Sequence, residues 1–488
     1  MTSPASSDRI LVWFRNDLRL SDNPAASAAL RAKEALFVYI EETNAGLRPR
    51  GGASRWWLHH SLESLARSLA ERGQILLILK GDSCQLVPAL AKGCRIDKVV
   101  WNRRYGQPDR NMDAAIKAEL KGAGIAAESF NGALLYEPME IRSKAGGPMR
   151  VFTPFWRACR AAREPEQPVA APDRLPPPMT LPAGAPALAD LGLLPTRPDW
   201  AGGLRASWEP GEAGAAARLA DFLAGPLGNY GENRNRPDFV STSRLSPHLA
   251  FGEISPRQIW HATEAARMAG QAAGNADDVE KFFSELGWRE FSHHLLFHFP
   301  TLPHANYQSK FDAFPWQEDA AGLAAWQRGL TGYPIVDAGM RELWQTGFMH
   351  NRVRMIVASF LIKHLMIDWR LGESWFWDTL CDADPANNAA SWQWVAGSGA
   401  DAAPYFRIFN PVTQGEKFDP DGVYVRKFVP ELARLPDKFI HKPWEAPHPI
   451  RQGAGILLGQ TYPQPVVRHE HARQRALAAF QSLSGEPL

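Results

Sequence analysis

Residues 380–394 read L-C-D-A-D-P-A-N-N-A-A-S-W-Q-W, and the chain continues as V-A-G-S-G-A-D-A-A-P-Y-F-R-I-F-N-P to residue 411. Two carboxylates, two amides and two tryptophans are set among Ala, Gly and Ser. A core that only buries apolar area would be filled with Leu, Ile and Val. Large rings beside small residues favour a site for a flat, polar-edged cofactor, but a Gly/Ala-rich loop before a strand, anchored by its tryptophans, explains the composition equally well.

Composition limits the class of protein. A chain of 488 residues is long enough for two or more domains. The sequence has no apolar run of membrane-spanning length and no basic, apolar leader, so we expect a cytoplasmic protein. Its four cysteines form no C-x-x-C pair, so we expect neither a disulfide framework nor a metal site. A net charge of +2 excludes a polycation but allows a local basic face.

Strand-like and helical stretches alternate over residues 8–131. The apolar runs are 10–14, 36–40, 75–79, 98–101 and 125–130, and stretches with helical spacing separate them. This alternation predicts an α/β domain, a doubly wound parallel sheet whose ligands bind at the carboxyl ends of the strands. No G-x-G-x-x-G follows the first run, which argues against a standard dinucleotide fingerprint.

The rest of the chain divides at a proline-rich segment. Prolines accumulate between Arg163 and Trp200, and we interpret residues 132–211 as an interdomain linker. From residue 212 to 488 the periodicity is helical, which predicts an all-α second domain.

Three segments of the second domain carry candidate chemistry. Thr242, Ser243 and Ser246 precede a predicted helix and could hold phosphate, although ordinary N-capping is the commoner use of such residues. Glu285 and Arg289 are four residues apart on one predicted helix, as in a surface ion pair or a buried polar site. Residues 341–370 have a basic bias that suits a phosphate backbone, or a solvated helix face.

Several longer motifs occur in one order along the chain. They are T-S-R-L-S-P from 242, W-R-E-F from 288, T-G-Y-P-I-V-D-A-G-M-R-E-L from 331, M-H-N-R-V-R-M from 349 and D-A-D-P-A-N-N-A-A-S-W-Q-W from 382. Together they closely resemble the DNA photolyase and cryptochrome family, over residues 9 to about 430. The resemblance implies an α/β domain followed by a helical, FAD-binding catalytic domain.

The resemblance also implies a set of FAD contacts. Asp382 and Asp384 would contact ribose and ring, and Asn388 would face flavin N5, where a neutral amide does not repel the reduced, anionic flavin. The residues expected to bind FAD are Tyr230, Thr242, Ser243, Leu245, Ser246, Phe282, Arg289, Arg354, Asp382, Asp384 and Asn388.

The implied reaction is light-driven repair of a cyclobutane pyrimidine dimer, flipped out of UV-damaged DNA, by an electron from reduced FAD. Glu285 would hydrogen-bond the pyrimidine edge. The residues expected to contact the dimer or its flanking phosphates are Arg234, Glu285, Trp288, Asn351, Arg352, Met355, Trp394, Arg407 and Lys417. Asn351 and Met355 stand where six-four photoproduct repair enzymes have histidines, which favours dimer repair.

Two further expectations follow from the resemblance. Trp392, Trp369 and Trp316 align with the electron-hopping chain of the family, although core packing is the ordinary role of any one tryptophan. The antenna pigment is expected to be 5,10-methenyltetrahydrofolate, with Asp109 in place of a family glutamate.

The leading prediction is therefore a monomeric cyclobutane pyrimidine dimer photolyase of class III or class I. The alternative is a cryptochrome-type blue-light photoreceptor without repair activity. A flavin-dependent redox enzyme that acts in the dark is a third possibility, and the missing dinucleotide fingerprint speaks against it.

Overall fold

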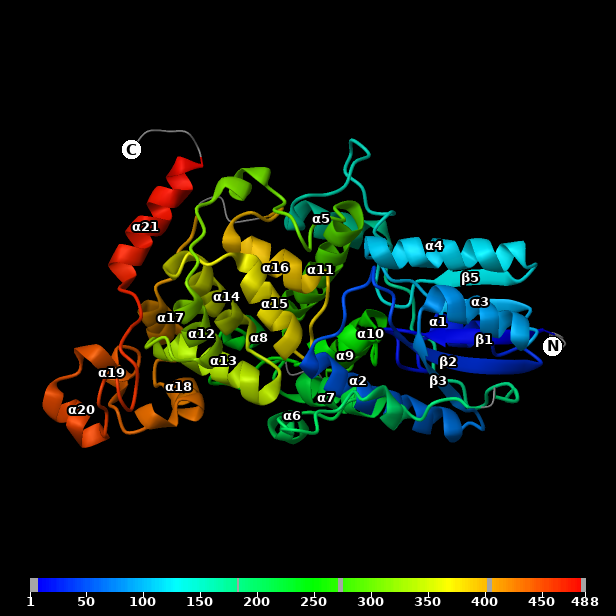
Figure 1. The fold of residues 1–488 in the computed structure, drawn as a ribbon, viewed down its shortest axis with the longest axis horizontal. Coiled ribbons are helices and arrows are strands. Elements are labelled where there is room, and N and C mark those ends of the chain that lie inside the picture. The colour runs from blue at the N-terminus through cyan, green and yellow to red at the C-terminus, as the bar shows by residue number, and fades with distance from the viewer. Residues whose placement is uncertain (1–7, 182–183, 271–274, 402–405, 484–488) are drawn as a thin grey trace.

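A five-stranded parallel sheet forms the first part of the molecule (Figure 1). The computed structural model describes residues 8–181, 184–270, 275–401 and 406–483. The strands are β1 (Arg9–Phe14), β2 (Glu34–Glu42), β3 (Leu76–Gly81), β4 (Lys98–Asn102) and β5 (Ala126–Phe130). Their spatial order is β3-β2-β1-β4-β5, so the order reverses between β1 and β4. All five predicted strands are confirmed. Buried runs of mainly apolar residues form β1, β2 and β4, as expected of strands that are covered on both faces, whereas β5 at the edge of the sheet is partly exposed.

Helices cover both faces of this sheet. They are α1 (Pro24–Ala28), α2 (Gly52–Ala70), α3 (Ser83–Gly93) and α4 (Gln107–Gly122). Val12 and Phe14 of β1 pack with α1 and α2, whereas Leu11 and Trp13 pack with α3 and α4. Alternate residues of one strand therefore face two different hydrophobic cores, as the pleat requires, and the predicted doubly wound domain is confirmed.

The segment between the two parts holds more regular structure than the proline content predicts. It contains α5 (Phe152–Ala162), the 3-10 helix η1 (Leu188–Leu191) and α6 (Gly202–Ser207). α5 packs against α11 (Ala276–His298), where a Cβ on Gly287 would lie 2.7 Å from the Trp156 ring. The extended chain at Pro177 and Pro178 runs beside Ala35 at the start of β2.

The remaining elements are helices, as the periodicity predicts. The first group is α7 (Glu212–Ala224), α8 (Tyr230–Asn233), α9 (Ser246–Phe251), α10 (Pro256–Met268), α11, η2 (Ser309–Ala313), α12 (Ala320–Arg328), α13 (Pro334–Thr346), α14 (Asn351–Ser359), the π-helical turn η3 (Phe360–His364), α15 (Trp369–Thr379) and α16 (Asn387–Ala396). The last group is α17 (Pro411–Phe418), α18 (Val423–Phe428), η4 (Pro430–Leu432), α19 (Asp437–Ile440), η5 (Pro443–Glu445), α20 (His448–Ala454) and α21 (His469–Ser482).

Residues 387–396 form helix α16, so the interpretation of this stretch as a loop before a strand is wrong. The Asp384 carboxylate starts the helix by accepting hydrogen bonds from the backbone N–H groups of Ala386 (2.9 Å) and Asn387 (2.7 Å). No helix among the described residues is both long and apolar enough to cross a membrane.

Candidate functional site

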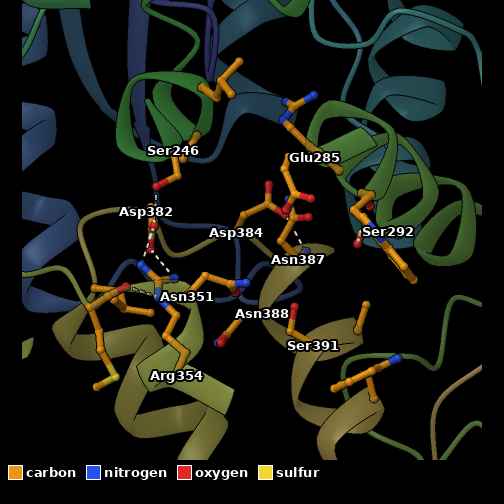
Figure 2. A pocket seen from close by; sticks show the side chains of 18 of the residues that line it. Ser246, Glu285, Ser292, Asn351, Arg354, Asp382, Asp384, Asn387, Asn388 and Ser391 are labelled. Carbon is orange, nitrogen blue, oxygen red and sulfur yellow. Dashed lines mark hydrogen bonds and ion pairs between the residues drawn. The ribbon is translucent and has the colours of Figure 1, made fainter. Parts of the chain in front are cut away.

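A cavity of about 470 Å³ lies inside the helical part. Its walls come from two hydrophobic clusters, one built on α10 and α11 and the other on α13 to α16. Figure 2 shows polar side chains of α11, α14 and α16 facing one another across it. A cavity of this size, apolar with a few convergent polar groups, is typical of a cofactor site.

All of the residues predicted to bind FAD line this one cavity, although they come from segments up to 158 residues apart in number, from Tyr230 to Asn388. Five residues predicted to contact the substrate also line it: Glu285, Trp288, Asn351, Met355 and Trp394. Trp392 lines it as well. The other predicted DNA contacts and tryptophans are not among its lining: Arg234, Arg352, Trp316, Trp369, Arg407 and Lys417.

Asp382 joins two walls of the cavity. Its carboxylate is paired with Arg354 of α14, at 2.8 Å and 3.1 Å, and accepts a hydrogen bond of 2.6 Å from the Ser246 hydroxyl of α9. The side chain of Asp382 is buried. Ser246 makes no side-chain cap of α9, so the N-capping interpretation of this serine is wrong, and its hydroxyl serves the cavity.

The Asp384 carboxylate is surrounded by positively charged and N–H groups. Burial alone would raise its pKa, but His293, Arg289 and the Asn387 N–H outweigh burial and lower the pKa well below its usual range. His293 approaches at 3.5 Å from α11. Sequence reasoning missed His293, although it lies four residues after Arg289 and so belongs to the same helix face.

Glu285 is paired with Arg234, which follows α8. Of the two interpretations of Glu285 and Arg289, the surface ion pair is wrong, because Arg289 instead donates a hydrogen bond of 2.7 Å to the Ala133 carbonyl and lies beside Glu290. Trp288 stacks on Phe152 of α5, with ring centroids 3.8 Å apart. The polar and aromatic groups at this side of the cavity are therefore held by elements distant in sequence.

The predicted phosphate contacts form a basic group outside the cavity. The Arg352 guanidinium donates to the Asn235 amide oxygen (2.7 Å) and lies 4.5 Å from the Phe418 ring, which Lys417 also approaches. Burial lowers the pKa of Arg352, and the charges of Arg234 and Arg407 lower it further. Positive charge is thus concentrated here.

Trp392 and Trp369 are buried in one hydrophobic cluster, and half-buried Trp316 packs against it. The Trp369 indole N–H donates to the Asn306 amide oxygen (2.9 Å). Among the described rings, Trp392 contacts Phe376 (centroids 5.0 Å apart) and Trp326 (6.2 Å), and no direct stacking joins the three predicted tryptophans. A Cβ on Gly372 would lie 2.2 Å from the Trp392 ring, so this glycine makes room for the indole.

The predicted antenna residue lies outside the cavity, in the first domain. Asp109 is in the first turn of α4 and is paired with Arg104 at 3.0 Å. Both side chains are largely buried.

His350 is a second residue that sequence reasoning left without a role. It caps α14, the helix that carries Asn351, Arg352, Arg354 and Met355, because its ring Nδ1 accepts a hydrogen bond from the Arg352 N–H (3.2 Å). Burial, then the nearby charges of Arg352 and Arg354, lower the pKa of His350 to about 4. The cap therefore requires a neutral ring.

We expect His350 to make the protein less stable in acid. Its pKa of about 4 in the folded state lies below the unfolded value of about 6.5, so the unfolded state binds the proton first as the pH falls. The free energy of unfolding should decrease from pH 6.5 towards pH 4, by up to roughly 1.4 kcal/mol per pH unit. His350→Asn, which caps without titrating, should flatten this dependence in urea unfolding, whereas exposed His471→Asn should not. Equal pH profiles for all three proteins would contradict the assignment.

The donor set of the cavity fits FAD. Carboxylates can accept hydrogen bonds from ribose hydroxyls and ring N–H groups, and hydroxyls can donate to phosphate oxygens. The small residues Ala383, Ala390 and Ser391 leave room for a flat ring system. Asn388 directs its side-chain N–H2 away, to Glu373, and its oxygen has no recorded partner among the described residues. The indole N–H of Trp392 is likewise buried and unpartnered within the described part of the chain.

Comparisons with known proteins agree with this geometry. Two family profiles match, "DNA photolyase" over residues 10–174 and "FAD binding domain of DNA photolyase" over residues 282–482. The chain is 54% identical to a deoxyribodipyrimidine photo-lyase of Agrobacterium fabrum, covering 97% of this chain and 98% of that protein. It is 40% identical to Cryptochrome-1 of Arabidopsis thaliana, covering 97% and 70% respectively.

A solved structure matches over the whole chain. The crystal structure of a bacterial class III photolyase from Agrobacterium tumefaciens has a TM-score of 0.95 and 52% identity, covering all of both chains. The fold, the donor set of the cavity and these matches lead to one conclusion, which is that the chain belongs to the DNA photolyase and cryptochrome family and has its FAD-binding domain.

Proposed function

We propose that the protein is a deoxyribodipyrimidine photo-lyase that uses light and reduced FAD to repair cyclobutane pyrimidine dimers in DNA. The single observation that carries the proposal is the composition of one cavity. Residues suited to FAD and residues suited to a pair of pyrimidines, Glu285, Trp288, Met355 and Trp394, share its walls. The 54% identity with a photo-lyase supports the same function.

The proposed FAD contacts divide by chemistry. The hydroxyls of Thr242, Ser243 and Ser246, with Tyr230 and Leu245 beside them, would hold the phosphates. Asp382 and Asp384 would accept hydrogen bonds from ribose and ring N–H groups, and their pairing with Arg354 and His293 keeps both carboxylates in place. The remaining proposed contacts are Phe282, Arg289 and Asn388.

The proposed substrate contacts place a flipped dimer at the same cavity. Trp288 and Trp394 offer apolar rings, Met355 a flexible apolar surface, and Asn351 an exposed amide. Arg234, Arg352, Arg407 and Lys417 would contact the flanking phosphates, which position the DNA without reading sequence. Extrusion costs less at a dimer, because the lesion already weakens stacking and pairing.

Reduced FAD, when bound and excited by light, supplies one electron that opens the dimer and then returns to the flavin. The chain's own residues position the partners. The Glu285 carboxyl, held by Arg234, would hydrogen-bond the pyrimidine edge, and the apolar walls would exclude water. The neutral Asn388 amide adds no negative charge near the flavin.

Several finer assignments belong to this proposal. Similarity to a class III photolyase structure favours class III. The proposed antenna is 5,10-methenyltetrahydrofolate, near Asp109. Asp109 is paired with Arg104, so it would have to bind the pigment in addition to Arg104 or in place of it. We further propose that the protein acts as a monomer in the cytoplasm.

The deciding experiment measures dimer loss from a UV-irradiated oligonucleotide with the pre-reduced protein, under blue light and in the dark. Repair only under light is the expected result. Binding of the damaged oligonucleotide without repair would favour a cryptochrome-type photoreceptor, in line with the Arabidopsis relative, and equal repair in the dark would favour a light-independent flavin enzyme.

A further inference from the structure

Glu373 is a buried carboxylate that links Asn388 to the first domain. It lies on α15 and is 5% exposed. Its Oε1 accepts hydrogen bonds from the Asn388 side-chain nitrogen (2.8 Å) and from the Arg48 guanidinium (2.7 Å). Asn388 donates to the Glu373 backbone carbonyl as well, at 3.0 Å. One carboxylate oxygen thus joins a cavity residue to an arginine 325 positions before Glu373.

Arg48 belongs to the loop between β2 and α2, and this loop is fixed tightly to α15. The Arg48 guanidinium lies 4.2 Å from the Trp377 ring, and the Trp377 indole N–H donates to the Pro49 carbonyl (2.8 Å). A Cβ on Gly51 would lie 2.2 Å from the Trp377 carbonyl oxygen, so only glycine allows this approach. The ion pair is therefore part of a defined contact between the two domains.

The two hydrogen bonds to Glu373 decide which end of the Asn388 amide faces the cavity. Because the side-chain nitrogen is bound to Glu373, the oxygen is the end left for a ligand. An amide oxygen accepts a hydrogen bond and does not donate one. It therefore favours a ligand that carries an N–H at this point over one that carries a bare nitrogen lone pair.

We propose that Glu373 is a positioning residue that holds the Asn388 oxygen towards the flavin, and that Arg48 of the first domain balances the charge of Glu373. The inference rests on the proposed position of FAD next to Asn388, and not on dimer repair. Flavin N5 carries a hydrogen in the fully reduced form and none in the oxidised form, so an acceptor at this point stabilises reduced FAD relative to oxidised FAD.

The charge balance acts in the same direction. A buried carboxylate without its cation would disfavour the anionic, reduced flavin by repulsion, and a buried ion pair that loses one partner leaves an uncompensated charge. Arg48 thus makes the reduction potential of bound FAD depend on the contact between the domains.

The test compares two double variants of equal net charge, Arg48→Met/Glu373→Ala and Arg48→Met/Glu373→Gln. Glutamine keeps a side-chain oxygen that accepts from Asn388, whereas alanine leaves Asn388 only the backbone carbonyl of residue 373 as an acceptor. The readout is the reduction potential of bound FAD, titrated in the dark without DNA. We expect the alanine variant to favour oxidised FAD about tenfold relative to the glutamine variant, the size of one hydrogen bond, which is about 30 mV for two electrons. Equal potentials would overturn the positioning role of Glu373.

Single variants test the charge balance and separate it from a general loss of loop docking. Arg48→Met should lower the potential of bound FAD, and Arg48→Lys should restore most of the loss. Asp378→Ala removes a contact at the end of the same loop, the 2.8 Å hydrogen bond from the N–H of Gly52, the first residue of α2. It does not alter Glu373 and should leave the potential unchanged. If Asp378→Ala lowers it as much as Arg48→Met, loop docking explains the effect and the inference fails. Loss of dimer repair with these potentials intact would contradict only the proposed function.

Discussion

The Asp382→Ala variant is expected to purify almost free of FAD. Asp382 pairs with Arg354 and accepts from Ser246, so its loss removes a proposed cofactor contact and also the link between α14 and α9. Breaking a buried ion pair by removing one partner costs about 3–5 kcal/mol, which corresponds to FAD affinity reduced roughly 10²–10⁴-fold. The flavin-to-protein absorbance ratio of the purified variant, and FAD titration of the apoprotein, would measure this.

Two further variants separate the cofactor contact from general damage. Asp382→Asn keeps the shape and some hydrogen bonds but not the charge, so it should retain more FAD than alanine does. Asp378→Asn alters an exposed carboxylate near the end of α15, outside the cavity, and should retain FAD fully. Normal FAD content in Asp382→Ala would remove Asp382 from the site.

The architecture could be predicted because it depends on local patterns. Four of the five strands contain a short apolar run, and the helices of the second part follow the 3.6-residue period. The linker was predicted less well. Proline and alanine dominate it, yet α5 forms because Phe152 and Phe155 bury their rings against α11 and its neighbours. Such tertiary contacts override local preference.

The cavity residues could be named because the motif order resembles a family, and composition alone left the alternatives open. Residues that support the site from a distance could not be named. Arg48 stands in an ordinary loop sequence, L-R-P-R, and meets Glu373 only when two domains come together. His350 was visible within M-H-N-R-V-R-M, but an N-cap histidine is identified only by its hydrogen bond. Residues 402–405 of the quoted stretch lie outside the described residues.

Trp392→Phe is expected to abolish photoreduction of bound oxidised FAD while leaving repair by the pre-reduced protein largely intact. Trp392 is the one member of the predicted chain that lines the cavity, and Trp369 lies with it in the same cluster. Phenylalanine keeps an apolar ring at this position but is far harder to oxidise than indole. Absorbance of the flavin under blue light with an external reductant measures the first activity, and dimer loss after chemical reduction measures the second.

Trp326→Phe is the matched control for this prediction. The Trp326 ring also contacts Trp392, at 6.2 Å, but its indole N–H is fixed to the Val357 carbonyl and its side chain is fully buried. The Trp326 ring has no exposed surface, whereas half-buried Trp316 at the edge of the cluster reaches solvent. Trp326→Phe should therefore photoreduce normally. If Trp392→Phe loses FAD and repair together, the indole is structural, and if Trp326→Phe also blocks photoreduction, electrons leave by a path other than Trp369 and Trp316.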